Sequence, residues 1–216
     1  MKHLSKVLLI IGLTLLHLPV RADQPKITTV QGSVTLNGTP AETGDHLSES
    51  DVLKAYESDT SYVDVSFPDG HLVRFKGANV KLNSIGNEIF LKLERGKAFP
   101  SVETEVDGQT SFQIKTPQAI MGIRGTKFFT QVTDRQTYAC VCEGQVSVQR
   151  RGSWNSGVGR IVTIPAGFDL HFFGNQPLSP PKLSPQMVTR TWNEFAKMGL
   201  EVPEPYRSKL PDVSSP

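Results

Sequence analysis

The chain has 216 residues, and its composition already excludes several classes of protein. It carries 23 Lys and Arg residues against 21 Asp and Glu residues, for a formal net charge of +2, and it has only two cysteines. Two cysteines exclude a miniature fold held together by disulfides. The modest charge excludes the broad positive field on which nucleic-acid binding usually depends. We therefore expect an ordinary folded domain with its own hydrophobic core.

The first 22 residues have the features of a cleavable secretion signal. Lys2 and Lys6 precede an apolar segment at residues 7–16, and Pro19 then leads to a cleavage site after Ala22. The apolar segment is shorter than the roughly 20 residues that a membrane-spanning helix needs. No later stretch is apolar enough to span a membrane either. We therefore predict a bacterial protein that is periplasmic or secreted, rather than one retained by a membrane anchor.

Loss of the signal changes the charge of the mature chain. Cleavage removes Lys2, Lys6 and Arg21 and no acidic residue, which leaves 20 Lys and Arg against 21 Asp and Glu in 194 residues, a net charge of −1. A near-neutral exported chain is not expected to bind nucleic acid.

Alternation of apolar and polar residues dominates the mature chain and predicts β-strands. Val63, Val65 and Phe67 alternate before a Pro68-Asp69-Gly70 turn, and apolar residues at 72–75 follow, which indicates a β-hairpin. We predict one all-β domain over residues 23–174, of short and mainly antiparallel strands in a two-layer sandwich or a solenoid. Further strands are expected at residues 34–36, 80–82, 89–93, 111–115, 127–133, 137–142, 145–149, 160–164 and 168–173.

Residues 175–216 are expected to form a Pro-rich linker, a short helix at about 185–199 and a flexible tail. Ser184-Pro185 is typical of a helix start and Gly199 of a helix end. Three apolar residues fall on one helical face: Val188, Trp192 and Phe195. We expect this face to dock on the β domain, because an exposed Trp and Phe stripe is costly in a monomer. The alternative is that it contacts a partner.

The most distinctive stretch lies at residues 115–128, where a strand end, a turn and a glycine-flanked corner follow one another. Gly122 and Gly125 permit backbone conformations or close approaches that a Cβ would block. The residues that define the motif are Thr116, Pro117, Gly122, Arg124, Gly125 and Thr126. This sequence resembles the FecR domain, named for the iron-dicitrate sensor regulator. The resemblance runs from about Thr29 to Phe173 through weaker segments such as Gly44–Leu47, Phe67–Gly70, Leu91–Ala98, Glu143–Val148 and Ile164–Gly167.

The resemblance implies an all-β extracytoplasmic domain used for sensing or scaffolding, with no established catalytic centre. Regulators of this family carry a cytoplasmic segment that controls a sigma factor, followed by a membrane helix. Here the predicted signal occupies that place, so direct control of a sigma factor is not expected. A following small domain that meets outer-membrane transporters is not expected either.

Arg124 has two interpretations. Its five donors can close the glycine-flanked corner by binding backbone carbonyl groups, which we favour. Alternatively, it can bind an anion or a carboxylate on a ligand or partner.

Cys140 and Cys142 share one face of a strand with Tyr138, while Ala139 and Val141 take the other face. Two residues along a strand separate Cα atoms by about 6.6 Å, near the upper limit of about 6.8 Å for a disulfide. Two buried thiols are the leading interpretation. A strained disulfide and a redox or metal pair remain open.

No catalytic or cofactor-binding constellation is present. The histidines at 46, 71 and 171 lack metal-ligand spacing, so no metal and no cofactor are expected. Trp154 lies in a Gly-rich loop and is either packed or offered to a sugar or an aromatic side chain.

We therefore predict a non-enzymatic binding, scaffolding or sensing module with an envelope protein or a glycan as its partner. The alternatives are an envelope redox protein that uses the Cys-x-Cys pair and an accessory subunit of a transmembrane signalling system.

Overall fold

The computed structural model describes residues 24–56, 60–86, 88–104, 111–150, 161–173 and 179–210. The predicted signal peptide lies outside these residues. The elements in this part of the chain are β1 (Lys26–Gln31), β2 (Val34–Leu36), β3 (Thr39–Pro40), β4 (Val52–Ala55), β5 (Tyr62–Ser66), β6 (Leu72–Ser84), β7 (Glu88–Val102), β8 (Ser111–Lys115), β9 (Ala119–Val132), β10 (Gln136–Arg150), β11 (Ile161–Pro165), β12 (Phe168–Phe173), β13 (Lys182–Leu183), α1 (Pro185–Lys197) and α2 (Glu204–Arg207). None of the described helices is long and apolar enough to cross a membrane.

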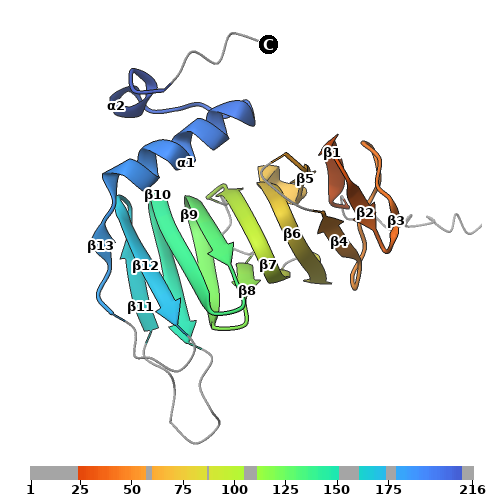
Figure 1. Ribbon diagram of the computed structural model, residues 1–216, viewed down its shortest axis with the longest axis horizontal. Helices are drawn as coiled ribbons and strands as arrows, with labels where there is room; N and C mark the ends of the chain where they lie inside the picture. The colour runs from red at the N-terminus through yellow and green to blue at the C-terminus, as the bar shows by residue number, and fades with distance from the viewer. Residues whose placement is uncertain are drawn as a thin grey trace, which may run out of the picture.

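The strands form one hydrogen-bonded sheet that folds over itself into two layers. Four long strands, β6, β7, β9 and β10, bend in the middle, and the two halves of each pair with different neighbours. In β6, for example, residues 72–76 pair with β5 and residues 79–81 pair with β4. Except for the parallel pair β7–β8, the pairings are antiparallel. The predicted all-β class is confirmed, and Figure 1 shows the strands following one another from β1 at one end to β13 at the other.

Each layer contains one half of every long strand together with several of the short strands. The first layer contains β1, β5, the first half of β6, the second halves of β7 and β9, the first half of β10, β12 and β13. The second layer contains β3, β2, β4, the remaining halves of the long strands, β8 and β11.

The main hydrophobic core fills the space between the layers. Alternate residues of each strand point into it, so that Val73 and Phe75 of the first layer join Leu91 of the second in one buried cluster. The rings of Phe67 and Phe112 meet across it with their centroids 5.8 Å apart. The Thr137 hydroxyl, also buried, donates to the Gln118 side-chain oxygen at 2.6 Å and ties β10 to the turn before β9.

Glycines make the bends of the long strands. A Cβ on Gly96 would clash with the carbonyl oxygen of Gly77, and one on Gly144 would clash with that of Gly125. Both Gly96 and Gly144 have positive φ, at +99° and +75°, which L side chains rarely adopt. The sequence predicted separate strands at 137–142 and 145–149, and separate strands before and after Gly77. These predictions were wrong about continuity, because the glycines bend one strand without ending it.

Several other sequence predictions are confirmed. Pro68–Gly70 forms a single 3₁₀ turn, and β5 pairs antiparallel with β6 across it, as the hairpin prediction requires. The strands expected at 111–115 and 168–173 appear with those bounds. β9 begins at Ala119, well before the predicted residue 127, because the motif itself forms a strand.

Candidate functional site

Helix α1 covers the outer face of the first layer. Its apolar residues Val188, Trp192 and Phe195 are at most 1% exposed and form a second hydrophobic cluster with sheet residues that include Phe99 and Phe129. Figure 1 shows the helix running from β13 across the neighbouring strands toward β5. Docking was the favoured interpretation of this face. The alternative, that these three residues contact a partner, is corrected here, because the chain itself covers them.

A buried ion pair fixes the C-terminal end of α1 to the sheet. The Arg74 guanidinium donates to both carboxylate oxygens of Asp64, at 2.7 and 2.8 Å, and to the carbonyl oxygen of Lys197 at 3.4 Å. It also lies 4.2 Å above the centre of the Tyr62 ring. Burial works against the charge of Arg74, but the Asp64 carboxylate keeps its pKa above the ordinary value. Arg74 is therefore charged, and the pair attaches the end of α1 to the sheet.

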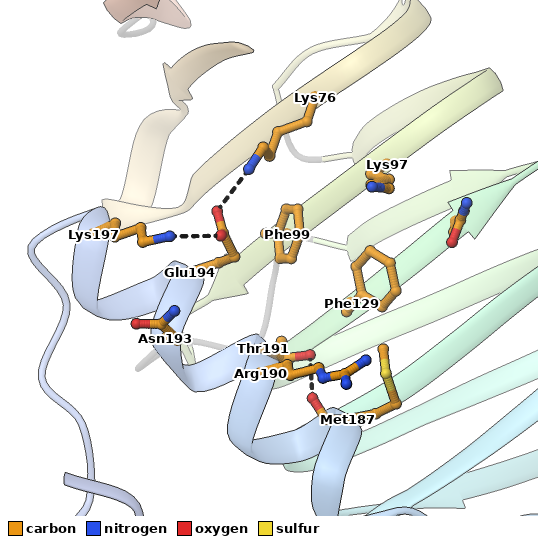
Figure 2. Close-up of a pocket in the computed structure, with 11 residues that line it drawn as sticks. Lys76, Lys97, Phe99, Phe129, Met187, Arg190, Thr191, Asn193, Glu194 and Lys197 are labelled. Atoms are coloured by element: carbon orange, nitrogen blue, oxygen red, sulfur yellow. Dashed lines mark hydrogen bonds and ion pairs between the residues drawn. The ribbon is translucent and has the colours of Figure 1, made fainter. Parts of the chain in front are cut away.

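Beside the ion pair, a groove of about 500 Å³ runs between α1 and the sheet. Its floor contains Phe99 and Phe129, whose rings stack with centroids 4.9 Å apart. Figure 2 shows these rings between the helix on one side and Lys76 and Lys97 on the other. The lining residues are Lys76, Lys97, Phe99, Phe129, Gln131, Met187, Arg190, Thr191, Asn193, Glu194 and Lys197. A volume of this size suits a small molecule or one or two units of a polymer.

The groove carries four basic side chains against one carboxylate. Lys76 and Lys197 donate to the two oxygens of Glu194, at 3.0 and 3.1 Å, so this carboxylate is shared between them. Burial alone would raise the pKa of Glu194, but the hydrogen bonds from the two lysines outweigh burial and hold it below its usual value. Arg190 is exposed on the wall, and within the described residues it forms no hydrogen bond or ion pair. The groove is therefore positively charged and suits an anion.

The predicted motif includes the bend of β9, where Gly125 lies against Gly144 of β10, and none of its residues lines the groove. The Thr126 hydroxyl lies 2.8 Å from the carbonyl oxygens of both Arg124 and Gln145, either of which can accept its one proton, and it accepts from the Gln145 amide at 3.3 Å. Gly125 has φ of +55°, whereas Gly122 needs no special conformation, and a Cβ there would meet its neighbours at ordinary contact distance.

Arg124 does not close this corner. Its side chain is exposed, and within the described part of the chain no oxygen accepts a hydrogen bond from it. The expectation that its guanidinium binds backbone carbonyls is corrected: strand alternation turns residue 124 outward, and the shorter Thr126 side chain reaches the carbonyls instead.

Thr116 and Pro117 form a tight turn between β8 and β9. The Thr116 amide donates to the Ala119 carbonyl oxygen at 2.8 Å, and the Ala119 amide donates back to the Thr116 hydroxyl at 3.0 Å. The Thr137 hydroxyl oxygen lies 2.9 Å from the same hydroxyl, which connects this turn to β10. The turn shapes the fold and contributes nothing to the groove.

Cys140 and Cys142 are free thiols in the second cluster, beneath α1. Burial raises the pKa of Cys140 to about 12, and burial raises the pKa of Cys142 as well. The Cys142 thiol donates to the carbonyl oxygen of Val188 at 3.7 Å. Because the thiolate is the reactive form, these positions disfavour redox chemistry at neutral pH.

Two further predictions concern Trp154 and metal binding. Trp154 lies outside the described residues. Within the described ranges, no three His, Cys, Asp or Glu side chains are close enough together to hold a metal ion.

The groove residues were not predicted from the sequence, although the sequence contains patterns that indicate a covered outer face. Residues 138–142 are apolar at every position, which indicates a strand buried on both faces. Phe99 and Phe129 likewise fall at outward positions beside the inward Ala98 and Phe128. These patterns indicate that something covers the outer face, but they do not show that α1 covers it.

Comparison with known proteins finds a matching family model and similar solved structures. Residues 54–147 match the family model described as FecR protein, a shorter range than the resemblance predicted. Two crystal structures of a protein from Parabacteroides distasonis ATCC 8503, proposed to be an anti-sigma factor, match with a TM-score of 0.50 and 18% identity. Each match covers 62% of this chain and 59% of the other, so the chain spans less than two thirds of those structures. At this identity the likeness shows a shared fold. No curated protein matches the chain.

Proposed function

Because this chain contains a FecR domain, we propose that it is an exported, non-enzymatic sensing and binding module of the bacterial cell envelope. The observation that carries the proposal is the positively charged groove between α1 and the first layer. A concave site with an aromatic floor and convergent charged groups is the usual form of a ligand site.

The groove is built on rigid supports. Its wall is fixed by the Arg74–Asp64 pair and by the buried contacts of Trp192 and Phe195, so the site exists before a ligand arrives. The buried thiols, with their raised pKa values, support binding rather than redox chemistry. The likeness to a protein proposed to be an anti-sigma factor supports a sensing role. In this role, ligand binding would change how the protein interacts with a separate membrane regulator.

The first experiment tests export. The full chain is fused at its C-terminus to a phosphatase that is active only outside the cytoplasm, and a variant with Ile10→Arg in the apolar segment serves as the control. We expect activity from the natural sequence, loss of activity from the variant, and a mature N-terminus at Asp23. Equal inactivity of both fusions would overturn the proposed location.

The second experiment tests binding. Purified protein is incubated with a solubilised envelope fraction in three forms: the natural sequence, Lys97→Glu/Arg190→Glu in the groove, and Arg124→Glu at the exposed corner. We expect an envelope component to be retained by the natural sequence and by Arg124→Glu, but not by the groove variant. Equal retention by all three forms, or by none, would contradict the proposal.

A further inference from the structure

A row of side chains extends the groove across the outer face of the first layer. Strand register places Lys76 opposite Lys97, Lys97 opposite Gln131, Gln131 opposite Tyr138, and Tyr138 opposite His171. Directly opposed side chains on one face of a sheet lie about 5 Å apart. The five residues therefore form one row over β6, β7, β9, β10 and β12, and α1 runs alongside it from the β12–β13 end to Lys76, which donates to Glu194.

The two ends of this row differ in chemistry. At the β6–β7 end, Lys76 and Lys97 face Arg190 across the groove. At the β12 end, the His171 ring lies 4.6 Å from the Tyr138 ring and stacks on Phe173, with centroids 6.0 Å apart and an interplanar angle of 7°. Phe173 is 45% exposed. The cations are thus followed by the Gln131 amide, by Tyr138, which is only 7% exposed, and then by the exposed rings of His171 and Phe173.

This combination matches the chemistry of an acidic sugar chain. Pyranose rings present apolar C–H faces that lie on aromatic rings, and carboxylates on the same rings pair with Arg and Lys. Hydroxyl groups find donors and acceptors in amide side chains.

A peptide fits the same surface less well. On the face of a sheet, the backbone N–H and C=O groups are already used in the ladder hydrogen bonds. An extended peptide lying across the strands would gain no backbone pairing, unlike a peptide that adds to a sheet edge.

We propose that this row binds an acidic oligosaccharide that carries hexuronate units, with carboxylates at Lys97 and Arg190 and a sugar ring on His171 and Phe173. The inference rests on the proposed function and names the ligand class for the same groove. It assigns Lys97 and Arg190 to charge recognition, and Phe173 to contact with the sugar ring.

The test is calorimetric titration of the full mature chain with three matched probes. These are a galacturonate hexamer, the fully methyl-esterified hexamer, and hexaglutamate. Measurements run at about 20 and about 200 mM NaCl, because pairing of exposed charges weakens as the Debye length shortens. The variants are Lys97→Glu/Arg190→Glu, Phe173→Ala and the matched control Arg124→Glu.

We expect the galacturonate hexamer to bind, with affinity falling at the higher salt concentration and little binding of the neutral ester. Lys97→Glu/Arg190→Glu should weaken binding by about tenfold or more and Phe173→Ala by about threefold to tenfold, while Arg124→Glu leaves it unchanged. Thermal unfolding of each variant confirms that it is folded.

Three outcomes would overturn the inference: equal binding of the neutral ester, tighter binding of hexaglutamate, or equal loss with Arg124→Glu. A failure of all three probes would also overturn it. If the envelope fraction still yields a component that depends on the groove, the proposed function stands and only the ligand class is wrong.

Discussion

The molecule has two hydrophobic clusters that are built in different ways. The core between the layers consists of inward-facing apolar residues from the strands of both layers. The cluster beneath α1 mixes aromatic rings with two thiols, and it borders the buried Arg74–Asp64 pair. The first core is thus formed by the β fold alone, whereas the second requires a helix from the far end of the chain.

The contrast shows where binding can arise in this fold. The side chains of the inner core are almost completely buried between the two layers. α1 covers only part of the outer face of the first layer. The groove lies along the edge of the helix, where the sheet is not covered. We expect the β layers to be the more stable part and α1 to open at a lower free energy. Six experiments test this comparison.

Asp64→Ala should have the largest effect on stability. It removes the carboxylate that accepts both hydrogen bonds from Arg74, which is 3% exposed, and leaves only the more distant Glu194 carboxylate at 3.9 Å. A buried charge that loses its main partner should lower the free energy of unfolding by about 3–5 kcal/mol, measured by urea denaturation. The exposed Glu204–Arg207 pair supplies the control, and Glu204→Gln should cost less than about 0.5 kcal/mol. Equal effects would mean that the Arg74–Asp64 pair does not stabilise the attachment of α1.

The thiols beneath α1 should resist alkylation in the native protein. At pH 8, raising the pKa of Cys140 from 9.0 to about 12 lowers its thiolate fraction about a thousandfold. Native protein should therefore react with iodoacetamide at least that much more slowly than denatured protein, as read by mass spectrometry. Fast native alkylation would show that the helix opens readily. Loss of both thiols without reducing agent would indicate a disulfide.

The raised pKa of Cys140 makes the stability of the folded protein depend on pH. The folded Cys140 binds its proton more tightly than the unfolded residue does, so its contribution is fully present below pH 9. That contribution is lost as the pH rises from about 9 through about 12. Cys140→Ala should therefore show a smaller decrease in stability than the natural sequence over this interval.

Phe112→Ala and Phe195→Ala compare the two clusters directly. Both rings are at most 1% exposed, so each truncation should cost about 3–4 kcal/mol. In hydrogen exchange, Phe112→Ala should accelerate exchange throughout the sheet, because the inner core is shared by both layers. Phe195→Ala should accelerate mainly the amides of α1. Uniform acceleration by both variants would show that sheet and helix unfold as one unit.

Gly144→Ala and Gly167→Ala together separate the effect of the close approach at a strand bend from the effect of positive φ alone. Its Cβ would meet the Gly125 carbonyl, whereas Gly167 has φ of +88° and open space around it. We expect a decrease of about 3 kcal/mol for Gly144→Ala and about 1 kcal/mol for Gly167→Ala. Similar values from thermal unfolding would mean that the close approach of the two strands adds nothing.

Arg124→Lys should have the smallest effect. Because the side chain is exposed and the Thr126 hydroxyl closes the corner, the change in stability should stay within about 0.5 kcal/mol. A larger loss would restore Arg124 as a structural residue. Thr126→Val is the matching variant that removes the hydroxyl, and it should cost about 0.5–1.5 kcal/mol, because it removes the hydrogen bonds to the partly buried backbone groups of Arg124 and Gln145.

The sequence by itself determined the class of the fold and many of its elements. Alternation at Val63, Val65 and Phe67 depends only on the two faces of a strand, so it could be read without the tertiary structure. The same holds for the Pro68–Gly70 hairpin and for the helix that begins at Pro185, because turn and helix signals are local.

Only the tertiary structure decided how the elements meet. The glycines were visible, but whether Gly96 and Gly144 end a strand or bend it depends on the backbone that crosses each one. The sequence favoured Arg124 as the residue that closes the corner of its motif, but the strand register places its side chain in solvent. Lys76, Lys97 and Arg190 are far apart in the sequence and unremarkable there. Pairing between strands and docking of α1 bring them to one groove, because these long-range contacts depend on the whole fold rather than on local sequence.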